Sequence, residues 1–235
     1  MSSSFLSLSQ NANISSVKFG VESQPLLKVD SYLQNPQVLI DYAINKNDFT
    51  VADNYYPGIR MPLPLSYLKA LVLNLGPNIE ATFGVDLKQI KTATAAFSII
   101  TTPLDKLGFV HTIPHFDGLG KNKLAILHYL CDMPDTGTCF YHHKALAYDY
   151  VDDNRAVWYF NYLEEQFKNK SKVYNSYICE ESPEFEKIAA YECIFNRLLI
   201  YKASSLHSGH ITPDYNFDPN PKTGRLTISS FIEFN

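Results

Sequence analysis

The sequence predicts a mainly β protein in which helices from the N-terminal third support the sheet. Aromatic residues make up 14% of the chain, with 16 Tyr and 15 Phe, and such a composition favours strands. Alternating or β-branched runs recur between residues 92 and 234, whereas helical apolar spacing is found mainly before residue 91. The chain has 235 residues, of which 46% are hydrophobic, and no shift in composition divides it. We therefore expect residues 1–235 to form a single domain.

The first 91 residues predict a short tail followed by a helical support region. Residues 1–16 are rich in Ser and Asn, and we expect them to be disordered. Residues 17–91 begin with a loosely alternating strand at 17–29 and continue with a helix that Pro36 opens. A second helix should begin at residue 66 and end at 75, because Gly76-Pro77 follows. The prolines between the two helices predict a rigid, irregular connection.

Residues 92–235 predict the β core. Strand-like runs end in turn signals, and one amphipathic helix interrupts them at 155–168. Residues 135–137 (Asp-Thr-Gly) predict a turn before a short strand. The expected strands cover residues 92–102, 124–130, 138–142, 192–202 and 225–234.

Charge and hydropathy exclude several classes of partner. The 20 basic and 24 acidic residues give a net charge of −4 and form no cationic stripe, so no nucleic-acid partner is expected. No apolar stretch is long enough for a membrane helix, and the N-terminus lacks a basic start. Four widely spaced cysteines without a CxxC pair indicate reduced thiols. We expect a cytoplasmic protein with no membrane partner.

One short segment indicates a metal site. In IPHFDGLG (113–120), Pro114 and Gly118 exclude a helix, so His115 and Asp117 lie on extended backbone and point to the same side. Two histidines and one carboxylate form the facial triad of non-haem Fe(II) oxygenases. His207, which follows a strongly apolar strand, is the favoured second histidine, and His210 is the alternative. A plain turn in which the carboxylate of Asp117 accepts a hydrogen bond is the competing interpretation.

The last strand offers an anion site. Arg225, Thr227 and Ser229 alternate along it, so their side chains share one face. A guanidinium binds a carboxylate through two parallel hydrogen bonds, and hydroxyls can add further ones. A dicarboxylate cosubstrate would fit this group. The competing interpretation of Arg225 is a surface salt bridge, and that of Arg60, beside Tyr56, is a loop-stabilising residue rather than a substrate contact.

In residues 92–234 the chain resembles the Fe(II)- and 2-oxoglutarate-dependent dioxygenases, in particular their prolyl-hydroxylase-like branch. The resemblance rests on an ordered set of motifs rather than on any single one. These motifs are the His115 and Asp117 pair, the aliphatic strand that ends in Tyr129 and Leu130, the glycine turn and strand at 137–141, FNRLLIY (195–201) followed by His207, and the strand headed by Arg225.

The resemblance implies a fold, a site and a reaction. The fold is a double-stranded β-helix, a jelly-roll or cupin-like core, with N-terminal helices on its larger sheet. The implied catalytic metal ligands for Fe(II) are His115, Asp117 and His207. Arg225 would bind the distal carboxylate of 2-oxoglutarate, and the implied additional hydrogen bonds come from Tyr129 with Thr227 or Ser229.

With O2 as the third reactant, the implied reaction is hydroxylation of an amino acid, a peptide or protein side chain, or a small metabolite. Two other functions compete with this one. The first is a non-catalytic jelly-roll protein that binds a metal or ligand. The second is a cupin-type hydrolase or isomerase that uses another metal at the same site.

Overall fold

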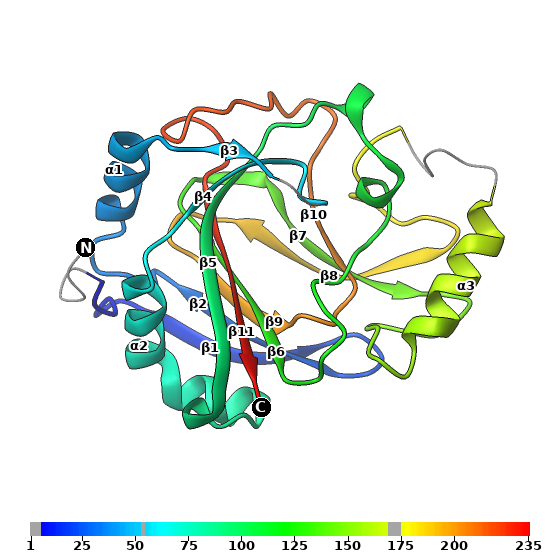
Figure 1. Cartoon of the computed structure of the whole chain (residues 1–235), viewed down its shortest axis with the longest axis horizontal. Helices are drawn as coiled ribbons and strands as arrows, with labels where there is room; N and C mark the ends of the chain where they lie inside the picture. The colour runs from blue at the N-terminus through cyan, green and yellow to red at the C-terminus, as the bar shows by residue number, and fades with distance from the viewer. Residues whose placement is uncertain (1–5, 53–54, 169–174) are drawn as a thin grey trace.

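The described part of the chain forms two antiparallel sheets and three α-helices (Figure 1). It is a computed structural model that describes residues 6–52, 55–168 and 175–235. The large sheet has the order β1-β2-β9-β6-β11-β5-β4-β3. Its strands are β1 (Asn13–Phe19), β2 (Gln24–Asp30), β3 (Thr50–Val51), β4 (Gly58–Pro62), β5 (Ile90–Ile100), β6 (Lys123–Tyr129), β9 (Leu198–Lys202) and β11 (Thr227–Phe234).

The small sheet has the order β10-β7-β8. Its strands are β7 (Met133–His143), β8 (Phe185–Cys193) and β10 (His207–Gly209). The helices are α1 (Gln37–Lys46), α2 (Ser66–Phe83) and α3 (Ala156–Phe167), and single 3-10 turns lie at Leu87–Gln89, Leu104–Lys106 and Phe109–His111. The predicted mainly β class is therefore confirmed. No helix in the described part of the chain is both long and apolar enough to span a membrane.

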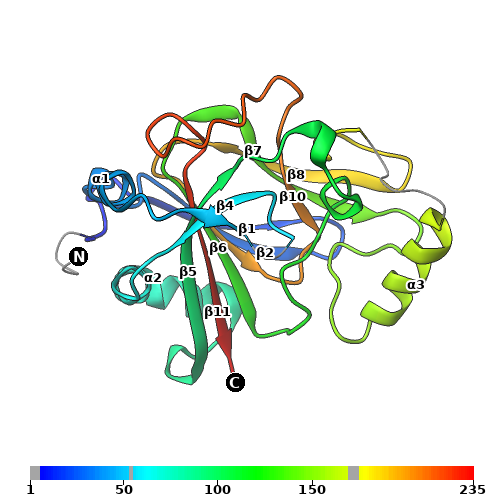
Figure 2. The same cartoon turned by 45° about the horizontal axis from the view of Figure 1, so that its top comes forward.

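Alternation along the central strands gives the large sheet two different faces. In β6, Leu124 and Ile126 belong to the main hydrophobic cluster together with residues of α1 and α2, whereas Ala125 and Tyr129 belong to a cluster with Phe140 of the small sheet. One face is thus covered by α1 and α2, and the other faces β7 and β8. Figures 1 and 2 show α1 and α2 on one side of the molecule and α3 at the opposite end.

Residues 1–16 were predicted to be disordered, but the structure shows that residues 6–16 are ordered. Leu6 is completely buried, and the backbone of Leu8 bridges that of Leu33. The side-chain nitrogen Nδ2 of Asn74 donates a hydrogen bond to the Leu6 carbonyl at 2.8 Å. The polar composition of this segment predicted that the loss of chain entropy on ordering would outweigh any burial. Burial of Leu6 in the main core offsets that loss. Residues 1–5 lie outside the described residues.

Residues 17–91 supply strands as well as helices. The segment predicted as one strand at 17–29 forms parts of two, β1 and β2, which pair as a hairpin. The predicted irregular connection contains β4, in which Arg60 lies opposite Ser98 of β5. Pro62 ends this strand at a position where its missing donor is tolerated. Arg60 is therefore held by a strand and not by a loop.

Helix α2 was predicted to end at residue 75, before Gly76-Pro77, but it continues through Pro77 to Phe83. Proline removes one helical hydrogen bond, and the carbonyl left without a donor is that of Leu73. Leu73 is 77% exposed, so water can satisfy that group. Beyond the proline, Ile79 is completely buried against the sheet. This apolar burial explains why the helix continues.

Two predicted strands in the C-terminal half have different bounds. The run at 192–202 is divided between β8 and β9, because Asn196 takes a positive φ of 62° between them. The turn predicted at residues 135–137 is a register shift within β7. Gly137 is needed there because a Cβ atom would overlap the carbonyl oxygen of Tyr191 on β8.

Buried polar side chains connect the sheet to the helix layer. The ring of His128 is completely buried. Its Nδ1 accepts a hydrogen bond from the Tyr67 hydroxyl (3.1 Å), and its Nε2 donates one to Asn196 Oδ1 (3.1 Å). Asn196 also accepts from the Leu33 amide (3.0 Å) and donates to the Leu33 carbonyl (2.9 Å). Burial lowers the pKa of His128 to about 4, and the hydrogen bond to Asn196 opposes this shift only in part, so the ring is neutral at pH 7.

The free energy of unfolding is expected to fall as the pH is lowered from 6.5 towards 4. In this window the unfolded chain binds a proton at His128 and the folded chain does not, because the folded pKa lies below the ordinary value of 6.5. One such histidine gives a slope of about 1.4 kcal/mol per pH unit. Urea denaturation at about pH 7, 6 and 5 measures it. An unchanged midpoint, or NMR titration of His128 near its ordinary pKa, would contradict the expectation.

Candidate active site

Main-chain hydrogen bonds bring the predicted metal ligands together. The amide of His115 donates to the carbonyl of His207, and the amide of His207 donates back to that of His115, both at 2.8 Å. The amide of Asp117 donates to the Ala203 carbonyl at 2.7 Å. Lys123 Nζ fixes the same turn from β6 through the Asp117 carbonyl at 2.9 Å. The extended 115–117 segment thus pairs with the chain that leads into β10.

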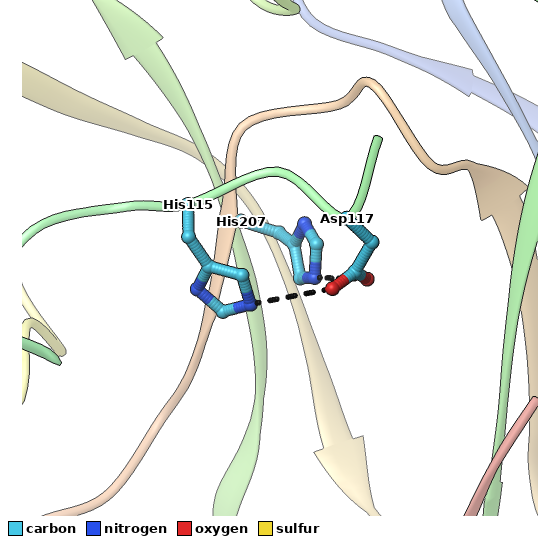
Figure 3. Close-up of side chains that lie close together, drawn as sticks. All are labelled: His115, Asp117 and His207. Atoms are coloured by element: carbon cyan, nitrogen blue, oxygen red, sulfur yellow. Dashed lines mark ion pairs between the residues drawn. The ribbon is translucent and has the colours of Figure 1, made fainter. Parts of the chain in front are cut away.

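The three side chains converge on one point (Figure 3). Nε2 of His207 lies 3.2 Å from Asp117 Oδ2, and Nε2 of His115 lies 3.9 Å from Asp117 Oδ1. One donor atom from each residue lies within 4.8 Å of the other two. Two imidazole nitrogens and one carboxylate oxygen at this spacing can ligate one metal ion.

The state of each donor suits metal binding. Nδ1 of His207 faces the Ser205 carbonyl at 2.8 Å and must donate to it, which leaves a lone pair on Nε2. Desolvation in the cavity and the adjacent His207 lower the pKa of His115, although 49% of its side chain is exposed. Burial raises the pKa of Asp117, but the two histidines lower it more, to about 2. At neutral pH His115 is therefore neutral and Asp117 ionised, as ligands must be.

The cluster opens into a cavity of about 970 Å³ that Arg225 also lines. Only 3% of Arg225 is exposed, and its guanidinium donates to the carbonyls of Gly137 (3.0 Å) and Thr136 (3.3 Å). Within the described ranges no carboxylate forms an ion pair with it. A buried guanidinium without an anion is costly, so this side of the cavity is suited to a carboxylate ligand.

The other predicted cosubstrate residues surround Arg225. Thr227 and Ser229 line the cavity, and the Thr227 hydroxyl donates to the Ser98 carbonyl at 3.2 Å. The Tyr129 ring lies 5.5 Å from the Arg225 guanidinium carbon, but its hydroxyl pairs with Thr138 Oγ1 at 2.6 Å. Thr138, rather than Tyr129, lines the cavity. Direct contact of Tyr129 with a bound cosubstrate stays a prediction.

Two other histidines are not part of the cluster. His210, the alternative ligand, has its Nε2 3.8 Å from Glu180 Oε1. His111 lines the cavity, but its ring accepts from the Gly108 amide (3.1 Å) and contacts the Tyr55 carbonyl (3.0 Å). Of the two candidates, the structure brings His207 to the His115 turn.

Sequence reasoning missed one wall of the cavity. Tyr159, Leu163 and Phe167 of α3 line it, although the helix reads as ordinary core. Their spacing of four residues gives an apolar face without showing what that face covers. Tyr201 lies against His207 with ring centroids 4.9 Å apart. The FNRLLIY motif contains this tyrosine but does not indicate that it faces the metal ligands.

Comparison with known families gives one match over most of the chain. The model of a family of unknown function, DUF6445, matches residues 10–232. No curated protein matches the chain.

Three solved structures of known proteins have a similar fold. A prolyl-4-hydroxylase from Pseudomonas putida matches with a TM-score of 0.51 at 10% identity, covering 92% of this chain and 95% of the other. The alpha-ketoglutarate-dependent carbocyclase SnoK from nogalamycin biosynthesis matches with 0.50 at 12%, covering 90% and 81%. Iron-bound HygX from Streptomyces hygroscopicus matches with 0.50 at 12%, covering 90% and 83%. These likenesses confirm the predicted fold class.

Proposed function

We propose that this chain, which belongs to the family of unknown function DUF6445, is an Fe(II)- and 2-oxoglutarate-dependent oxygenase. One observation carries the proposal: the His115, Asp117 and His207 cluster lines the same cavity as the guanidinium of Arg225, which forms no ion pair with a carboxylate of the described residues. A metal that keeps open positions and a site for a carboxylate are what such a reaction requires. The fold shared with a prolyl-4-hydroxylase, SnoK and HygX supports it.

The residues have separate roles in this proposal. His115, Asp117 and His207 hold Fe(II), and the carbonyl of Ser205 keeps His207 in the correct tautomer. Arg225 binds the distal carboxylate of 2-oxoglutarate, with hydroxyl donors from Thr227 and Ser229. Bound iron and 2-oxoglutarate would supply the activation of O2 with loss of CO2 and formation of succinate. The apolar wall from α3 would keep water away from the reacting centre.

Asp117 favours hydroxylation over halogenation. Its carboxylate points at the two histidine nitrogens and is ionised, so it would be the third protein ligand of a bound metal. A small residue there would leave that position for a halide. We therefore expect a hydroxylated product.

Two measurements test the proposal. Anaerobic titration with Fe(II) and then 2-oxoglutarate should give the visible charge-transfer band of the chelated complex. Admission of O2 should then give succinate, even without the prime substrate. Binding without succinate would instead support a binding protein, and metal-dependent activity without O2 and 2-oxoglutarate would support a hydrolase or isomerase.

Replacing Arg225 with glutamine is expected to weaken 2-oxoglutarate binding by about 10-fold to 100-fold, because a charged bidentate contact is lost. Metal binding should not change, since Arg225 contacts none of the three ligands. Calorimetric titration of the metal-loaded protein measures both affinities, and the unfolding midpoint checks that the buried substitution is tolerated. Arg225→Lys keeps the positive charge but cannot form two parallel hydrogen bonds, so its 2-oxoglutarate affinity should lie between those of the wild type and Arg225→Gln. An unchanged affinity in Arg225→Gln would reject the assignment.

A further inference from the structure

The cavity contains a second arginine that the proposed iron and cosubstrate sites do not use. Four basic side chains line it, namely Arg60, Lys123, Lys168 and Arg225, against the two acidic side chains Asp117 and Glu164. This excess of positive charge is found in a chain whose net charge is −4. Bound Fe(II) would add further positive charge, and 2-oxoglutarate would neutralise only part of it. The electrostatic field of the cavity therefore favours a second anion.

Arg60 is the basic residue that remains available for this anion. Arg225 is assigned to the cosubstrate, and Lys123 Nζ is bound to the Asp117 carbonyl. Lys168 is exposed at the end of α3. Arg60 is half-buried, its Nε is buried without a hydrogen-bond partner, and no carboxylate pairs with it among residues 6–52, 55–168 and 175–235. An unsatisfied buried donor of this kind indicates a missing acceptor.

Strand register places Arg60 in the same polar row as the cosubstrate residues. Arg60 on β4 lies opposite Ser98 on β5, and Ser98 lies opposite Thr227 on β11. Residues directly opposite each other in antiparallel strands share one face. The guanidinium carbon of Arg60 lies 4.2 Å from the centre of the Tyr56 ring, and such stacking leaves the N–H edge free for a planar anion.

The rest of the cavity is suited to an apolar body. Phe109, before the metal turn, and Phe116, between His115 and Asp117, contact α3. The ring centre of Phe109 lies 5.6 Å from that of Phe167, and the ring centre of Phe116 lies 6.0 Å from those of Tyr159 and Phe160. All five rings line the cavity. Its volume of about 970 Å³ is near the upper end for small-molecule pockets, so a second molecule has room beside 2-oxoglutarate.

From these observations, and resting on the proposed function, we infer that the substrate is a small amphipathic carboxylic acid. Its carboxylate binds the N–H edge of Arg60, and its apolar part packs on the aromatic wall formed by Phe109, Phe116, Tyr159, Phe160 and Phe167. Arg60 and Arg225 are thus two separate carboxylate sites in one cavity.

The test is calorimetric titration of the full chain, saturated with Mn(II) and 2-oxoglutarate, with a panel of acids. The panel is butanoate, hexanoate, octanoate and phenylacetate, each paired with its neutral primary amide. We expect at least one acid to bind, and to bind about tenfold tighter than its amide. Arg60→Gln should remove this preference and leave 2-oxoglutarate affinity within about twofold. Arg60→Lys should restore part of it.

Two matched variants separate the possible outcomes. Lys168→Gln removes a charge from the same cavity and should leave the preference for acids unchanged. Arg225→Gln should weaken 2-oxoglutarate only, and in this variant the acids are also titrated without metal or cosubstrate. Failure of the wild-type chain to bind 2-oxoglutarate, with Arg60-dependent acid binding intact, would reject the proposed function alone. No acid binding, equal binding of acids and amides, or loss of 2-oxoglutarate affinity in Arg60→Gln would overturn the inference.

Discussion

Replacing Asp117 with alanine is expected to abolish succinate formation and to weaken metal binding by more than about 100-fold. The carboxylate is the only anionic donor of the cluster, and its oxygens lie 3.2 Å from His207 Nε2 and 3.9 Å from His115 Nε2. Changes to residues that merely orient metal ligands already cost about 10-fold to 100-fold in affinity. Loss of a ligand should cost more. Competitive metal titration and measurement of succinate under O2 give the two values.

His210→Gln is the matched control for this variant. His210 is the histidine nearest in sequence to His207, but its ring faces Glu180. Its replacement should leave metal affinity and succinate formation within about twofold. A loss of metal in His210→Gln with retention in Asp117→Ala would show that the metal binds elsewhere.

Replacing Asn196 with alanine is expected to lower the free energy of unfolding by about 3 kcal/mol or more. The substitution leaves three buried groups without partners: the amide and the carbonyl of Leu33, and Nε2–H of His128. Each unsatisfied group costs about 1–3 kcal/mol. Alanine is also disfavoured at the φ of 62° found at this position. Urea denaturation measures the change from the shift in midpoint.

Two further variants separate the causes. Asn196→Gly accepts the positive φ, so it should recover only the backbone part, about 1 kcal/mol, and remain destabilised by the lost hydrogen bonds. Asn45→Ala, at an exposed position of α1, should change stability by less than about 0.5 kcal/mol. If Asn196→Gly were as stable as the wild type, the side-chain network would have little energetic weight.

The sequence predicted those parts that depend on local pattern. The spacing of His115 and Asp117 on non-helical backbone required their side chains to share a side, and the structure shows that they do. The alternation of Thr227 and Ser229 correctly predicted a common face on the cavity. Helix α3 was also predicted with nearly its observed bounds.

What the sequence could not predict depends on contacts between distant residues. The order of Leu6 and the passage of α2 through Pro77 both follow from burial against the large sheet. The break at Asn196 follows from its hydrogen bonds with Leu33, far away in the chain. The position of Arg60 beside the cavity depends on the pairing of β4 with β5, which a proline-rich segment does not suggest.

For the proposed iron site, the reciprocal main-chain hydrogen bonds between His115 and His207 have a consequence for how the metal would be acquired. Backbone pairing, and not the ion, holds the two ligand-bearing segments together. A chelator should therefore strip the protein without unfolding it, and the folded apoprotein should take up iron again. The fraction of molecules with metal bound would then depend on the ferrous iron concentration around the folded protein, and not on whether iron was present while each molecule folded.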